Sequence, residues 1–420
     1  MLLRSLHITD TKSAHNGQIR DLRVDENQIA AIAEHLDPED GEAVIDLTGV
    51  HATPGFVDIG AYLGDPGHEE REDITSMRAA AAAGGYTTVA VLPDTDPVRQ
   101  SVADVAYLLR QNGKDPVDLY PLVALSKNLE GKDMVEMLDL NDAGALVFTD
   151  GPERNTSASL LKRTLEYSRV RDLTVMVSPF DPTLAPDGQI HEGETSTRMG
   201  LRGIPEMSEV IPLKTALEIQ AYTAGILIVH LISTAAGVAE VRRAKEAGLE
   251  IFATVSAHHL QFTVEELAGF DPDFKMLPPL RGEADRRALI EGLKDGTIDA
   301  IVSNHHARHG EEKDLEFSYA DFGALGLQTA FRQAMAALRD EMPLDELVDK
   351  FNRRPGLLLG RMPTRITVGG PAALTLFSPE GESTFAAEDI RGKTKNSPLV
   401  GRVLPGKIVG VVNHGVFLKA

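Results

Sequence analysis

Three histidines crowd into one short segment, Asn304-His305-His306-Ala307-Arg308-His309, and imidazole is the side chain most often found on metals. On a helix, His309 would share a face with both His305 and His306, because residues three and four apart are neighbours. That spacing could serve a metal site. The alternative is that the segment is a polar loop without a ligand.

Nucleophilic catalysis has little support in this chain. Ser178 is followed by proline and has no histidine that the sequence can pair with it, and Ser303 beside His305 is a weaker case. No Gly-x-Ser-x-Gly elbow, phosphate-binding loop or dinucleotide fingerprint stands out. The chain contains no cysteine, which excludes disulfides, cysteine–zinc sites and thiol nucleophiles.

Composition narrows the class of protein. The 420 residues carry a formal net charge of −21, so neither a nucleic acid nor an anionic membrane is an expected partner. There is no apolar run of about 18 residues, the length that spans a bilayer. The N-terminus turns polar too quickly for a signal peptide. We therefore expect an acidic cytoplasmic protein.

In the middle of the chain, short apolar runs typical of strands alternate with amphipathic stretches typical of helices, and these elements would position a site. Runs rich in β-branched residues, separated by helical patterns at Ala235–Ala247 and Glu283–Lys294, indicate a parallel sheet buried on both faces. Such units repeated over about 300 residues suggest a (β/α)8 barrel, although periodicity alone does not exclude an open sheet. The expected strands are Thr87–Leu92, Leu173–Val177, Ile226–Val229 and Ile298–Val302.

Both ends of the chain read as short strands with turns. This pattern predicts one small sheet domain built from residues 1–52 and 366–420, around a middle part of residues 53–365. The expected strands are Leu2–Ile8, Ile19–Val24, Ala373–Phe377, Val400–Leu404 and Ile408–Val412.

The segment Pro54–Gly67 resembles the opening motif of the dihydroorotase family, Pro-Gly-Phe-Ile-Asp-x-His-Val-His-Leu-Arg-Glu-Pro-Gly. The resemblance continues in order almost to the C-terminus and implies a barrel of the amidohydrolase superfamily flanked by a small β-sandwich. The further blocks are Arg78–Val89, Leu92–Thr95, Ala143–Asp150, the helix start at Glu206, Pro278–Arg281, Gly323–Thr329 and Asn396–Leu399.

The resemblance implies a zinc centre whose ligands are mostly missing here. The two histidines of the opening motif correspond to Gly60 and Tyr62. The bridging ligand corresponds to Asp150, which is kept, and the two later histidines correspond to Ser178 and Leu231. A lone carboxylate does not hold a zinc ion that normally takes three or more protein ligands.

The family's general acid/base and substrate contacts are also replaced. The aspartate that takes a proton in the family corresponds to Asn304, whose amide cannot do so. The substrate-binding arginine corresponds to Gly64, and two asparagines correspond to Asp94 and Leu277. Asp94 would repel an anionic substrate. No catalytic, substrate-binding or metal-ligating residue is therefore expected to function.

His230 stands one residue before the ligand position at Leu231. Successive strand side chains point to opposite faces, so we expect His230 to face away from the metal position and to bond between strand and helix. A bulge would reverse that direction. His191 is expected to be solvated.

This degenerate pattern resembles the non-catalytic dihydroorotase-like proteins of bacteria. The resemblance implies a structural or regulatory partner of aspartate carbamoyltransferase in pyrimidine biosynthesis, within a homo- or hetero-oligomer and without a cofactor. The alternative is an active zinc-dependent cyclic amidohydrolase whose metal has moved to Asp150, His230 and residues 305, 306 and 309. A second alternative is a sensor that binds a pyrimidine intermediate without turnover.

Overall fold

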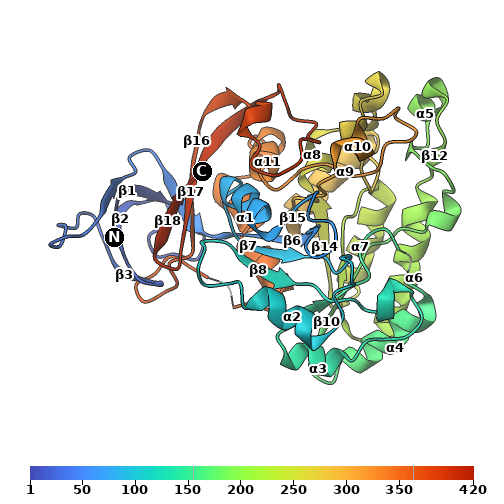
Figure 1. Ribbon diagram of the computed structural model, residues 1–420, viewed down its shortest axis with the longest axis horizontal. Coiled ribbons are helices and arrows are strands. Elements are labelled where there is room, and N and C mark those ends of the chain that lie inside the picture. Colours follow the sequence, from blue (N-terminus) through green and yellow to red (C-terminus); the bar gives the residue numbers. More distant parts are fainter. Residues whose placement is uncertain (155, 363) are drawn as a thin grey trace.

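The computed structural model describes residues 1–154, 156–362 and 364–420. It consists of a β/α barrel and a smaller sheet domain at one end, and both chain termini lie in the smaller part (Figure 1). Among the described residues, no helix has both the length and the hydropathy needed to cross a bilayer.

The barrel is formed by a three-stranded and a five-stranded parallel sheet, in the orders β6-β7-β8 and β9-β10-β13-β14-β15. A parallel bridge between Val123 and Phe148 joins the two sheets on one side. On the other side the Tyr62 N–H donates to the His305 carbonyl at 3.0 Å and closes the ring. The barrel strands are β6 (Phe56–Ala61), β7 (Tyr86–Val91), β8 (Asp118–Pro121), β9 (Val147–Phe148), β10 (Thr174–Val177), β13 (Ile226–Val229), β14 (Ile251–Ser256) and β15 (Ala300–Val302).

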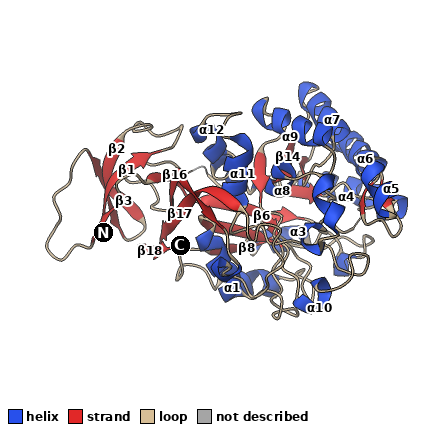
Figure 2. Ribbon diagram, turned by 90° about the horizontal axis from the view of Figure 1, so that it is seen from above, coloured by secondary structure: helices blue, strands red, loops and turns tan. Residues whose placement is uncertain are grey.

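Helices surround the strands, as the view from above shows (Figure 2). The two predicted helices are present and begin at the predicted residues. The first starts at Ala235 because the Thr234 hydroxyl accepts the N–H of Gly237 and caps it. The helices are α1 (Ile74–Ala83), α2 (Val102–Leu109), α3 (Met137–Asp142), α4 (Ala158–Ser168), α5 (Glu194–Met199), α6 (Met207–Thr223), α7 (Ala235–Glu246), α8 (Ala257–Gln261), α9 (Glu283–Lys294), α10 (Gly310–Lys313), α11 (Ala330–Leu338), α12 (Leu344–Asp349) and α13 (Arg353–Leu358).

The smaller domain is a sheet built from both ends of the chain, in the order β18-β17-β16-β5-β1-β2-β3, with β4 paired to β1. Two predicted strands, Val400–Leu404 and Ile408–Val412, form the single strand β17, which begins only at Val403 because Val400 lies in a turn. The strands are β1 (Leu2–Ile8), β2 (Ile19–Asp25), β3 (Gln28–Ala33), β4 (Val44–Asp46), β5 (His51–Pro54), β16 (Leu374–Thr384), β17 (Val403–Asn413) and β18 (Val416–Lys419). The predicted fold, a (β/α)8 barrel with a small β-sandwich from both termini, is confirmed.

Side chains fill the barrel interior, as is usual for this architecture. The inward-facing residues form one buried apolar cluster, which includes Val57, Ile59, Ala90, Leu92, Leu122, Val147, Met176, Ile228, Ala300 and Val302. Where barrel and sheet meet, Phe56 packs against Phe331, Phe351 and Phe377, with ring centroids 4.7, 5.5 and 6.4 Å away. This cluster fixes β6 against the β16–β17 hairpin.

Candidate functional site

The positions singled out in the sequence gather at the carboxyl ends of the barrel strands. In this architecture that end carries the active site, because the loops that follow the strands converge there. Gly60 and Tyr62 come from β6 and the loop after it. Ser178 follows β10, Leu231 follows β13, and Asn304 follows β15.

Gly60 lies at an irregularity of β6, where the pairing with β7 shifts register between Ile59 and Ala61. Its φ of +88° belongs to the left-handed region that favours glycine. A Cβ atom placed on Gly60 would lie 2.4 Å from His230 Nε2. The space for a side chain at position 60 is therefore already occupied by an imidazole ring.

His230 points into the barrel, which makes the expected outward direction wrong. β13 and β6 are not neighbours in the sheet order, so the contact between His230 and Gly60 crosses the barrel interior. His230 keeps the alternation with the inward-facing Ile228, whereas Leu231, with a left-handed φ of +63°, breaks it and also lies in the interior cluster. His230 Nδ1 lies 2.9 Å from Thr254 Oγ1, on the adjacent strand rather than on a helix.

The His230 ring is a neutral group in a closed environment. Burial lowers the pKa of His230 to about 3, so it carries no charge at neutral pH. Its Nε2 atom has no hydrogen-bond partner among the described residues.

Tyr62 covers this interior at the second histidine position of the family motif. Its ring stacks on His306 with centroids 3.5 Å apart and planes 7° from parallel. Only 9% of Tyr62 is exposed, and it belongs to the same apolar cluster as Leu231. Burial raises the pKa of the Tyr62 hydroxyl, which keeps the phenol neutral and makes it a poor metal ligand.

Asp150, the one retained ligand position, is engaged in a structural contact. Its Oδ1 accepts the N–H groups of Leu125 and Ser126 at 2.9 and 2.8 Å, and its Oδ2 accepts the Ser126 hydroxyl at 2.6 Å. Both carboxylate oxygens thus fasten the loop after β8. Burial raises the pKa of Asp150, partly offset by these hydrogen bonds.

The remaining positions that the resemblance assigned to metal ligands and to the general acid/base carry leucine, serine and asparagine. Leu231 is buried and apolar. The Ser178 hydroxyl oxygen is buried without a partner among the described residues and lines a cavity of about 180 Å³ between α4 and α6. The Asn304 side-chain amide donates to the Leu277 carbonyl at 3.1 Å, so these two family positions contact each other.

The substrate positions are blocked or carry the wrong charge. A Cβ atom on Gly64 would lie 2.1 Å from the carbonyl oxygen of His68 and 2.7 Å from that of Glu72. The loop that follows β6 thus fills the space of the family arginine. Asp94 places a carboxyl group at the mouth, where burial and then the nearby Glu153 raise its pKa to about 6. At neutral pH it is largely an anion.

The three clustered histidines do not converge. The helix begins only at Gly310, so residues 305 to 309 never form the shared face that the spacing suggested. His305 Nε2 lies 3.1 Å from Glu72 Oε2, and its Nδ1 accepts the N–H of Gly326 at 3.2 Å. His306 stacks on Tyr62, and His309 caps the following helix. Across residues 1–154, 156–362 and 364–420, no three His, Asp or Glu side chains are grouped as metal ligands.

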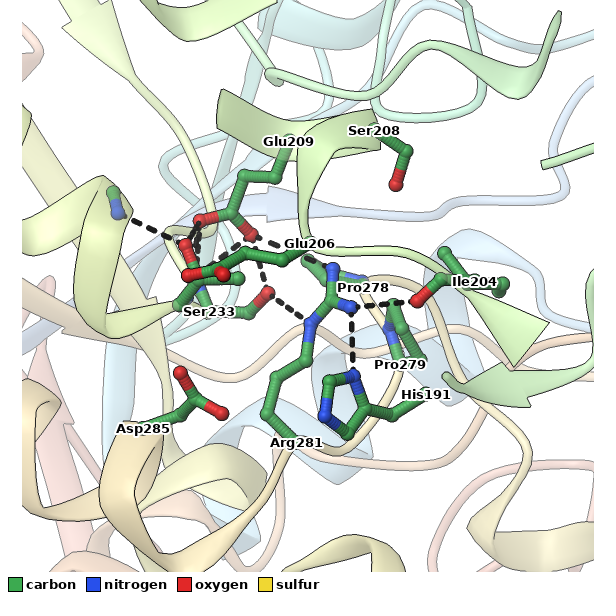
Figure 3. A network of polar contacts seen from close by, with 12 residues as sticks. His191, Ile204, Glu206, Ser208, Glu209, Ser233, Pro278, Pro279, Arg281 and Asp285 are labelled. Carbon is green, nitrogen blue, oxygen red and sulfur yellow. Dashed lines mark hydrogen bonds and ion pairs between the residues drawn. The ribbon is translucent and has the colours of Figure 1, made fainter. Parts of the chain in front are cut away.

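A buried ionic network near the mouth was missed in the sequence (Figure 3). The Arg281 guanidinium donates to Ser233 Oγ at 3.1 Å and to the Ile204 carbonyl at 3.0 Å, and it lies 3.9 Å from the Glu209 carboxylate. It also contacts His191 Nδ1 at 3.1 Å, so His191 is not simply solvated. The one hint in the sequence is Glu209, a carboxylate that stands among mostly apolar residues at the start of α6.

Glu209 is the acceptor centre of this network. It is 2% exposed and accepts the Thr234 N–H at 3.0 Å and the Thr234 hydroxyl at 2.7 Å, besides the Ser233 hydroxyl. The turn from β13 into α7 is therefore fixed by a carboxylate on α6. This arrangement positions the segment around His230 and Leu231.

A zinc ion of the family type does not fit these residues. Zinc in catalytic sites takes three protein ligands from His, Cys or carboxylate and keeps a fourth position open for water. Here glycine, tyrosine, serine, leucine and asparagine occupy family positions, and the remaining carboxylate already accepts three hydrogen bonds. Without the metal, nothing at the mouth lowers the pKa of water towards 7.

Comparison with known proteins adds to this geometry. Residues 50–236 match the family model described as dihydro-orotase-like. The chain is 36% identical over 407 residues to a dihydroorotase of Carboxydothermus hydrogenoformans, covering 96% of this chain and 94% of that protein. It is 34% identical to a dihydroorotase of Syntrophus aciditrophicus, and the match covers 99% of this chain and 98% of that protein. The L-hydantoinase structure from Arthrobacter aurescens superposes with a TM-score of 0.86 at 22% identity, and the match covers 100% of this chain and 95% of that one.

Proposed function

The chain belongs to the dihydroorotase family, and we propose that it has lost zinc-dependent ring hydrolysis and serves pyrimidine biosynthesis as a structural or regulatory partner of aspartate carbamoyltransferase. The observation that carries the proposal is the state of the barrel mouth. Only Asp150 survives among the family's ligand and acid/base positions, and its oxygens are hydrogen-bonded to the loop after β8.

The loss extends to substrate recognition as well as to metal binding. A substrate carboxylate would meet a backbone-filled space at Gly64 and the carboxyl group of Asp94. Placing like charges together disfavours binding of that ligand, so Asp94 acts against the family's anionic substrate. The metal-ligand positions and the substrate-binding positions are replaced together. A loss of the hydrolytic activity explains this better than the exchange of a single ligand does.

A second candidate is an active dihydroorotase with a relocated metal, and the names of the relatives favour it. Chains 36% and 34% identical over nearly their whole length are called dihydroorotase. Such a centre would have to use Asp150, His230 and the histidines at 305, 306 and 309. The last three side chains point to Glu72, to Tyr62 and to the start of α10. This candidate therefore needs a rearrangement of the mouth.

The partner is inferred from the family resemblance and is tested by association. The untagged chain is mixed with aspartate carbamoyltransferase from the same organism and passed over a sizing column with light-scattering detection. We expect one peak that contains both chains in a fixed ratio. Two separate peaks at micromolar concentrations and moderate salt would contradict the partnership. An unrelated protein of equal net charge, run in place of this chain, controls for non-specific attraction.

A further inference from the structure

We propose that Gly60 and His230 form an interlocked pair, in which the His230 ring fills the space of the missing side chain at position 60 and makes the barrel mouth part of the core. The inference goes beyond the proposed loss of hydrolysis, since it concerns the space at position 60 and not the ligands. It implies that position 60 has no room for a ligand side chain while the His230 ring stays in place.

The contact itself is the first support. His230 Nε2 and Cε1 lie 2.4 and 2.7 Å from the position of a Cβ on Gly60, closer than two such atoms pack. Because β13 and β6 lie apart in the barrel order, the ring must reach across the interior to make this contact. Any side chain at position 60, including the family histidine, would have to displace it.

The surroundings of the ring leave it little freedom to move. His230 is fully buried, its Nδ1 is held by Thr254, and the Thr254 hydroxyl oxygen also accepts the Leu231 N–H at 3.1 Å. The strand below is packed into the apolar interior through Ile228. A displaced ring would have to break these contacts or enter a filled core.

A second layer covers the pair. The stacked rings of Tyr62 and His306 lie at the mouth, and both residues are 9% exposed. Ion pairs then join three of the loops around the mouth. Arg71 in the loop after β6 contacts Glu312 at 2.5 Å, and Arg308 after β15 lies 3.5 Å from Glu153 after β9. The His230 ring thus fills the space below the stacked rings, and ion pairs connect the loops above them.

The test is a double-mutant cycle with Gly60→Ala, His230→Ala and the pair, read as shifts in Tm. Gly113→Ala is the matched control, because Gly113 has a similar φ of +84° and nothing packs within 4 Å of its Cβ position. The control reports only the cost of the left-handed backbone, roughly 2 °C. We expect Gly60→Ala to lower Tm by roughly 4 °C, because the clash adds to that cost.

In the His230→Ala background, the same Gly60→Ala change should cost no more than the control. A Gly60→Ala chain that fails to fold alone but folds with His230→Ala also supports the interlock. Equal costs of Gly60→Ala in both backgrounds, or a failure to fold in both, would overturn it.

The cycle is independent of the proposed function. Coupling between the two residues in a wild-type protein that hydrolyses dihydroorotate would leave the interlock standing and remove the proposed function. If Gly60 and His230 are not coupled and the wild-type protein shows no turnover, the interlock is removed and the proposed function stands.

Discussion

Replacing Glu209 with alanine is expected to lower the free energy of unfolding by about 3–5 kcal/mol, because it leaves the buried Arg281 guanidinium without its carboxylate. The Ser233 and Thr234 N–H groups would also lose the acceptor that fixes the turn into α7. Guanidinium unfolding followed by circular dichroism measures the loss as a shift of the midpoint.

Glu206→Ala is the matched control for this prediction. Glu206 stands one turn earlier at the start of the same helix and is exposed, and among the described residues its side chain accepts only the Ala236 N–H at 3.4 Å. Its removal should change stability by no more than about 0.5 kcal/mol. If the two substitutions cost the same, the network around Arg281 does not stabilise the barrel as described.

Phe56→Ala is expected to have a similarly large effect, about 3–5 kcal/mol, through a different mechanism. The fully buried Phe56 ring packs among Phe331, Phe351 and Phe377. Its removal therefore opens a cavity where β6 meets α11 and β16. Thermal unfolding measured by calorimetry should show a lower Tm for the whole chain, since the two parts share this core.

Tyr222→Ala serves as the control for an aromatic deletion. Tyr222 lies on α6, and 73% of it is exposed, so its removal should be close to neutral. A Phe56→Ala protein as stable as Tyr222→Ala would mean that the junction cluster does not hold the two parts together.

Much of the fold was predictable because it depends on local patterns. The apolar β-branched runs at 226–229 and 298–302 could only be buried parallel strands once helical patterns separated them. The proposed loss of ligands stays a prediction from the sequence, and it rests on glycine at position 60 and leucine at position 231, whose side chains offer no atom that binds a metal.

The directions of particular side chains were not predictable. Alternation counted from Leu231 placed His230 outside the barrel, but Leu231 is left-handed and departs from the alternation that His230 keeps with Ile228; nothing in the sequence marks that backbone. Helical spacing grouped residues 305, 306 and 309, whereas the helix starts after them. The Arg281–Glu209 contact joins residues far apart in the chain, which only the fold brings together.

The measurement that tests the central claim most directly is the metal content of untagged protein by elemental analysis, together with a dihydroorotate hydrolysis assay on the same sample. The account predicts zinc below about a tenth of an equivalent and no turnover, because only Asp150 is kept among the family's ligand positions and it already accepts three hydrogen bonds. About one equivalent of zinc or more, with turnover that a chelator removes, would contradict it and make the displaced histidines the active site.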